Sequence, residues 1–344
     1  DRNNTHLWMQ LSHAGRQTPF SINKESRAPS VQPLPTLGGI LKFGVPKELS
    51  QSEILNIIDQ FVNAAEVAKQ TGFTGVQLHS AHGYLLSEFL SPNVNQRTDE
   101  WGGSIENRSR LLITIEAIRD KVGSNFPISV KLNSSDFQKG GFTHEESIQV
   151  ARILNNTSLD LLEISGGTYE NFTALEMDSF NLKKAKTIKP QRSTRVREAY
   201  FLKYAEAIKD VISIPLAVTG GFRSAEGMNN ALQSGACDVI GLGRPLCSEP
   251  DIVNKLISGE KKSATLYENM LEFGPWILGL NSPISLMRSN NKAAQVYWCY
   301  RQILKIADGN EVDTKLGLFK AFLDHFRDDS ANSKKYKAFW KDLD

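Results

Sequence analysis

The chain has 344 residues, a formal net charge of +2, and 40% hydrophobic and 23% charged residues. This composition is ordinary for a globular protein and gives no reason to expect binding to nucleic acid or to an anionic membrane surface. The three cysteines, Cys237, Cys247 and Cys299, show no CxxC spacing. A disulfide framework, a cysteine zinc site and a cysteine-held iron–sulfur cluster are therefore disfavoured, and a reducing, cytoplasmic location is expected.

Short apolar strands alternate with amphipathic helices along most of the chain. The apolar spacing predicts strands at residues 7–12, 75–79, 127–133, 160–165, 215–219 and 238–241, and helices at 50–70, 104–122, 144–155, 194–212 and 225–233. Ser50 with Glu53, and Thr143 with Glu146, have the spacing of capping boxes at two of the helix starts. This alternation predicts an α/β protein with a parallel sheet and helical crossovers, either doubly wound or closed into a barrel.

A barrel built from these units would be incomplete. Six strand–helix units are predicted, whereas a (β/α)8 TIM barrel has eight, so if the sheet is a barrel we expect the first two βα units to precede Asp1. The N-terminally truncated barrel is expected over residues 1–260. A helical extension packed on it is expected over residues 261–344, with helices at 266–280, 295–306 and 315–326 and a loosely ordered terminus. The proline-containing segment 18–49 is predicted to be a functional or mobile loop.

Three side chains with catalytic potential follow the strand predicted at residues 75–79. His79, His82 and Tyr84 lie at its carboxyl end, where a (β/α) barrel carries out its chemistry. The two histidines could serve a metal-dependent hydrolase, with Glu163 as the one candidate for a third ligand, or they could be structural. With Tyr84 added, the pattern favours a metal-free site that donates hydrogen bonds and a proton to a substrate.

Two glycine loops, each with an arginine, follow the last two predicted strands. The sequence TGGFR contains Gly220, Gly221 and Arg223, and the sequence GLGRP contains Gly243 and Arg244. The corresponding loops of a barrel commonly bind phosphate through backbone N–H groups, and arginine adds a bidentate charge. Phosphate binding is therefore favoured over two ordinary turns with surface arginines.

Two polar side chains lie inside predicted strands. Lys131 either faces an electron-rich cofactor atom or is buried against Glu163 or Asp136. The Gln10 amide either hydrogen-bonds to the edge of a ligand ring that carries donors and acceptors, or hydrogen-bonds to backbone groups inside the protein. An aldolase barrel that uses Lys131 as a Schiff-base nucleophile stays an alternative. The sequence has no GxGxxG, GxxxxGK[ST] or GxSxG, which disfavours a Rossmann dehydrogenase, a P-loop ATPase and an α/β-hydrolase.

Taken together, these segments resemble the Old Yellow Enzyme family of FMN-dependent ene-reductases, also described as NADH:flavin oxidoreductases. The matching motifs run from about Leu7 to about Pro250 and are WMQLSHAGRQ, QLHSAHGYLLSEFLSPNVNQRTDEWGGSIENRSR, VKLNSSDFQKGGF, ISGG, VTGGFRS and GLGRP. The resemblance implies bound FMN, NADH or NADPH as reductant, and ping-pong reduction of the activated C=C bond of an α,β-unsaturated carbonyl. It also implies two further N-terminal βα units with additional flavin contacts.

The resemblance gives each candidate residue a role. Gln10 matches the glutamine at the flavin pyrimidine edge, and Lys131 the basic residue near flavin N1. The phosphate loops are matched by Gly220, Gly221, Gly243 and Arg244, with Arg223 adjacent. His79 and His82 match the pair that holds the substrate oxygen, and Tyr84 the proton donor to the α-carbon.

The expected partner is then a small-molecule enone, with neither nucleic acid nor membrane, and a homo-oligomer is one option for assembly. A catalytically silent barrel that binds other partners is the remaining alternative. The complete set of Gln10, Lys131, His79, His82 and Tyr84 disfavours it, because a silent site has no need of them.

Overall fold

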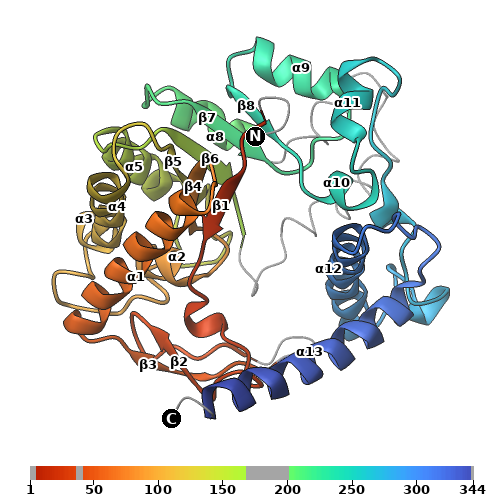
Figure 1. The fold of residues 1–344 in the computed structure, drawn as a ribbon, viewed down its shortest axis with the longest axis horizontal. Helices are drawn as coiled ribbons and strands as arrows, with labels where there is room; N and C mark the ends of the chain where they lie inside the picture. Colours follow the sequence, from red (N-terminus) through yellow and green to blue (C-terminus); the bar gives the residue numbers. More distant parts are fainter. Residues whose placement is uncertain (1–4, 36–41, 168–200, 342–344) are drawn as a thin grey trace.

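A parallel sheet of six strands organises the molecule (Figure 1). The computed structural model describes residues 5–35, 42–167 and 201–341. The strand order is β1-β4-β5-β6-β7-β8, and every neighbouring pair is parallel. All six predicted strands are confirmed, with these bounds: β1 (Trp8–Leu11), β4 (Gly75–Ser80), β5 (Ile128–Asn133), β6 (Leu161–Ser165), β7 (Leu216–Thr219) and β8 (Val239–Gly241).

Helices follow the strands and cover the outer face of the sheet (Figure 1). Capping boxes at Ser50 and Thr143 begin α1 and α5, as the sequence predicts. The apolar face of α1 packs on β1, β4 and α4, and Val76 and Leu78 of β4 are fully buried beneath it. The helices of this region are α1 (Gln51–Gln70), α2 (Leu85–Leu90), α3 (Ile105–Arg108), α4 (Thr114–Val122), α5 (His144–Asn155), α8 (Leu202–Lys209), α9 (Ala225–Gln233), α10 (Arg244–Ser248) and α11 (Ile252–Ile257).

The continuous helix predicted at residues 104–122 is wrong. The structure has α3, a 3-10 turn, Arg110–Ile113, and then α4. The side chain of Arg108 turns inward, donates to the carbonyl oxygens of Gly103 and Leu90, and pairs with Glu146 of α5. Because this buried ion pair fixes the end of α3, tertiary contacts override the helical periodicity. The helix predicted at 194–212 begins outside the described residues, and its described part is α8.

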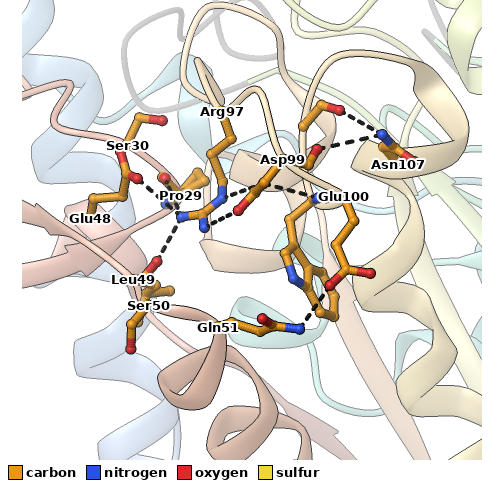
Figure 2. Close-up of polar contacts among 12 residues, drawn as sticks. Pro29, Ser30, Glu48, Leu49, Ser50, Gln51, Arg97, Asp99, Glu100 and Asn107 are labelled. Atoms are coloured by element: carbon orange, nitrogen blue, oxygen red, sulfur yellow. Dashed lines mark hydrogen bonds and ion pairs between the residues drawn. The ribbon is translucent and has the colours of Figure 1, made fainter.

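The segment predicted as a loop at residues 18–49 contains a small parallel sheet of β2 (Glu25–Ala28) and β3 (Val45–Glu48). Figure 2 shows how Arg97 anchors it. One guanidinium nitrogen donates to the carbonyl oxygens of Leu49 and Pro29 at 2.6 and 3.2 Å, while Asp99 binds the opposite side of the guanidinium group. The Arg97 side chain is only 6% exposed, so these bonds are largely shielded from water.

The C-terminal part is helical but differs from the prediction. No single helix spans 266–280; the described chain has two 3-10 turns there, Tyr267–Asn269 and Trp276–Leu278, because Gly274 and Pro275 interrupt it. The helices α12 (Ser285–Ala307) and α13 (Leu318–Lys341) confirm the other two and are longer than predicted. They pack together around Trp298 and Ala321, and α13 runs below the sheet to β2 and β3 (Figure 1).

The division at residue 260 and a loosely ordered terminus stay predictions. Among the described helices, none has both the length and the apolar composition that crossing a bilayer requires.

Candidate active site

A chain of four polar side chains crosses four neighbouring strands. Gln10 Nε2 donates to Gln77 Oε1 at 2.7 Å, and Gln77 Nε2 donates to Glu163 Oε2 at 2.7 Å. Lys131 Nζ lies 2.8 Å from Glu163 Oε1. The register explains the chain, because Gln10 is paired with Gln77, and Lys131 with Glu163, across the sheet. The inner face of the sheet therefore carries a connected row of amide, carboxylate and ammonium groups.

Lys131 and Glu163 form a largely buried ion pair. Their side chains are only 15% and 14% exposed. Burial would by itself raise the pKa of Glu163, but Lys131 and hydrogen bonds from Lys131, Thr219 and Gln77 lower it, so the carboxyl is ionised at neutral pH. Of the two buried partners considered for Lys131, Glu163 is the one found. Asp136 instead accepts hydrogen bonds from Ser91 Oγ at 2.6 Å and from the Phe142 N–H at 3.0 Å.

The structure brings His79, His82 and Tyr84 together at the end of β4. The ring centroid of His79 is 5.1 Å from that of His82 and 4.8 Å from that of Tyr84, both in edge-to-face arrangements. His82 has a left-handed backbone, with φ of 61°, that turns the chain sharply after the strand. The Asn133 side chain accepts from the His82 N–H, and the Gln17 side chain donates to its carbonyl oxygen, which holds that turn.

Both imidazoles are held in the neutral state. Burial, with the nearby charge of Lys131, lowers the pKa of His79 to about 4. Burial also lowers the pKa of His82 well below its usual value. The Ala81 N–H donates to His79 Nδ1 at 3.3 Å, so the hydrogen of the neutral His79 ring lies on Nε2. His79 is thus a hydrogen-bond donor that does not need to be charged. His82 Nε2 shares a hydrogen bond of 2.8 Å with Ser165 Oγ.

The lowered pKa of His79 has a consequence for stability in acid. The folded-state pKa, about 4, lies below the unfolded value of 6.5, so between these pH values the unfolded chain binds more protons. Stability should therefore fall as the pH falls from 6.5 towards 4, by up to about 3 kcal/mol from this residue. His79→Asn, whose amide oxygen can still accept from the Ala81 N–H, should flatten the decline in urea melts between pH 7 and 4.5. Substitution of the exposed His6 by Asn is the control; equal slopes for the two variants would contradict the assignment.

The two predicted glycine loops lie at the ends of β7 and β8. Gly220 and Gly221 have φ of 140° and 84°, which favour glycine and turn the chain out of β7. Gly243 is the N-cap of α10, and a Cβ placed on it would meet nothing within 4 Å, so its backbone is open to a ligand. The arginines of both loops contact one carboxylate. Glu268 Oε1 lies 2.5 Å from Arg223 Nη2 and 3.3 Å from Arg244 Nη1.

The predicted residues therefore form three groups: Gln10 with Lys131, the trio after β4, and the arginines of the glycine loops. The group of Gln10 and Lys131 lies next to the trio after β4, because His79 is the register partner of Lys131 on the neighbouring strand. Sequence reasoning missed Gln77, which was detectable as a glutamine inside a strand two residues before His79, and therefore on the same face. It also missed Ser165 and Glu268, whose partners lie far away in the sequence. Within the described residues, no three His, Cys, Asp or Glu side chains are grouped as a metal ion would require.

Comparison with known proteins gives consistent matches. Residues 1–263 match the NADH:flavin oxidoreductase / NADH oxidase family. The chain is 39% identical over 266 residues, or 77% of its length, to the NADH-dependent flavin oxidoreductase nadA of Aspergillus parasiticus. It is 32% identical over 73% of its length to the cinnamate reductase of Clostridium sporogenes. The solved old yellow enzyme homologue from Zymomonas mobilis superposes with a TM-score of 0.60 at 26% identity, covering 81% of this chain and 74% of that one.

These matches confirm the fold class. They also show what share of each relative's length the chain covers. The six parallel strands belong to a sheet of the (β/α) barrel type, as predicted. The chain spans 57% of the Aspergillus relative and 37% of the Clostridium relative.

Proposed function

The chain belongs to the NADH:flavin oxidoreductase / NADH oxidase family, and from that membership we propose that it binds FMN and reduces α,β-unsaturated carbonyl compounds. The motif resemblance to this family is thereby confirmed. The proposed reductant is NADH or NADPH and the proposed substrate is a small enone. The cinnamate reductase among the relatives supports this substrate class. A cytoplasmic location is part of the proposal and is supported by three free thiols.

The observation that carries the proposal is the adjacency of a neutral histidine donor and a strand lysine on one face of the sheet. Lys131 and Gln10 offer an ammonium group and an amide, which suit the electron-rich edge of a flavin ring. Gly243, with its open backbone, and the arginine beside it suit a phosphate. The residues present therefore fit FMN. When bound, FMN would supply the hydride-transfer chemistry that links NADH or NADPH to the β-carbon of the enone.

The side chains of the site would then act on the substrate oxygen and the α-carbon. His79 donates a hydrogen bond from Nε2 to the carbonyl oxygen, and the His82 ring, 5.1 Å away between ring centroids, lies beside the same oxygen. Together they stabilise the negative charge that develops on that oxygen. Because His79 is neutral, it polarises the oxygen without giving up its proton. Tyr84 holds its hydroxyl proton for the α-carbon, and Ser165 and Asn133 keep His82 in place.

The deciding experiment is a visible absorption spectrum of the purified protein after incubation with FMN. A yellow flavin spectrum should bleach when NADPH or NADH is added without oxygen and should return when cyclohexenone is added. A colourless protein that takes up no FMN would contradict the proposal and revive the hydrolase and silent-barrel alternatives.

Phenols mimic the enolate oxygen and test the histidine pair separately. We expect His79→Ala together with His82→Ala to weaken phenol binding to the flavin-loaded protein by at least about tenfold, because hydrogen bonds to an anionic oxygen are lost. The measurement is the long-wavelength absorption change on phenol titration. His144→Ala, on α5, is the control. Unchanged phenol affinity in the double variant would remove the pair from the oxygen site.

A further inference from the structure

Glu268 places a carboxylate on the arginines of both glycine loops. Its Oε1 is 2.5 Å from Arg223 Nη2 and 3.3 Å from Arg244 Nη1. The side chains of Glu268 and Arg223 are 11% and 9% exposed, so this contact is shielded from water, while Arg244 is 27% exposed. The same two arginines flank the loops proposed above for phosphate. An anion from the chain itself therefore lies where an anion from a ligand would be attracted.

Glu268 is brought there by the C-terminal region. It lies in the 3-10 turn Tyr267–Asn269. Gln295 of α12 donates from Nε2 to the carbonyl oxygens of Glu268 and Leu271, at 2.8 and 3.0 Å, and so fixes the turn. The family match ends at residue 263, before this turn. Membership of the family therefore does not account for Glu268.

The charge at this place decides what the arginines can bind. Burial would raise the pKa of Glu268, but the guanidinium groups of Arg244 and Arg223 lower it, so the carboxylate is ionised at neutral pH. Among the described residues, Arg223, Arg244 and Glu268 together carry two positive charges and one negative charge. A phosphate monoester carries about −1.5 to −2 at pH 7 and forms its strongest hydrogen bonds with guanidinium groups. It would meet arginines that are already shared with a carboxylate.

We propose that Glu268 is a specificity-determining residue of the phosphate site, an internal anion that competes with the phosphate of the cofactor for Arg223 and Arg244. The inference rests on the proposed function, because it takes the phosphate of FMN as the competing ligand. It follows that FMN binds less tightly than it would if the Glu268 carboxylate did not contact Arg223 and Arg244. It also follows that phosphate binding loosens the turn Tyr267–Asn269 from the barrel, while a flavin without phosphate leaves the turn in place.

The test compares FMN with riboflavin, which has the same ring but no phosphate. Dissociation constants for both are measured by quenching of flavin fluorescence, in the wild-type chain and in Glu268→Gln. We expect Glu268→Gln to bind FMN about tenfold more tightly, because one repelling charge is removed, with riboflavin affinity unchanged. The matched control is Glu272→Gln, which removes the same charge from an exposed residue four positions further on. It should leave both constants as in the wild-type chain.

Two outcomes separate the competition from the proposed function. An unchanged ratio of FMN to riboflavin affinity in Glu268→Gln, or a weaker FMN affinity, overturns the competition and leaves the proposed function standing. A chain that binds neither flavin, in any variant, overturns the proposed function and this inference with it. Should Glu268→Gln fail to fold, amide hydrogen exchange in the wild-type chain decides. The turn amides of Asn269 and Met270 should exchange faster with FMN bound than with riboflavin bound, and equal rates overturn the competition.

Discussion

Replacing Lys131 by methionine should lower the free energy of unfolding by about 3–5 kcal/mol, the typical cost of removing one partner of a buried ion pair. Methionine fills a similar length but leaves the Glu163 carboxylate without its cation. The amide of Gln77, at 2.7 Å, cannot replace a full charge. The measurement is urea unfolding of the protein without added flavin, so that stability is separated from any loss of cofactor.

Two variants sharpen this prediction. Lys131→Met combined with Glu163→Gln should recover most of the loss, because no buried charge is left uncompensated. Lys121→Met removes the same side chain from a surface pair with Glu66, in which Lys121 Nζ lies 3.0 Å from Glu66 Oε2 and the side chains are 44% and 35% exposed, and should cost less than about 1 kcal/mol. If Lys131→Met and Lys121→Met are equally mild, the pair on the sheet is not a buried ion pair in solution.

The second large effect is expected at Tyr84. Tyr84→Phe should slow reduction of an enone by the reduced protein by about 10²–10⁴-fold, the usual contribution of a positioned general acid. Reduction of the flavin by NADH or NADPH should keep its rate, because that half-reaction needs no proton on a substrate carbon. The two rates are measured separately by anaerobic stopped-flow absorption. The ring of phenylalanine retains the edge contact with His79, so the change is confined to the hydroxyl group.

Ser87→Ala provides a control for this variant. The Ser87 hydroxyl donates to the Tyr84 carbonyl oxygen and accepts from the Gly83 N–H, so its loss disturbs the same turn without touching the phenol. Equal slowing of both half-reactions in Tyr84→Phe would exclude Tyr84 as the proton donor. Equal slowing in Ser87→Ala and Tyr84→Phe would point to the turn instead of the hydroxyl.

Local sequence patterns were sufficient to predict the six strands of the sheet and the starts of α1 and α5. The strands are short apolar runs, and Ser50 and Thr143 begin their helices with capping boxes whose partners lie three residues away. Such signals depend on neighbours in the sequence, so a single chain reveals them. The trio of His79, His82 and Tyr84 was readable for the same reason, since one strand end presents all three.

What the sequence did not reveal depends on partners that are distant in the chain. Arg108 interrupts the helix predicted at 104–122 because Glu146 and the Leu90 carbonyl lie beside it in space. Glu268 reaches Arg223 across 45 positions. Neither contact leaves a periodic pattern. Gln77 is different, because its place in β4 beside Gln10 follows from strand register and was predictable from the sequence.

The position of α13 has a consequence for how the chain folds. Its Ser333 hydroxyl donates to the carbonyl oxygen of Ser21 at 2.6 Å, a contact that closes a loop of 312 residues. Contacts of such separation pay a large entropic cost of loop closure before they contribute any stability, so they form late. The helices α12 and α13 have their own core around Trp298 and can pair early. Docking of this preformed pair onto the segment before β2 would then be a slow final phase of folding, set by diffusion of two folded parts instead of by strand assembly.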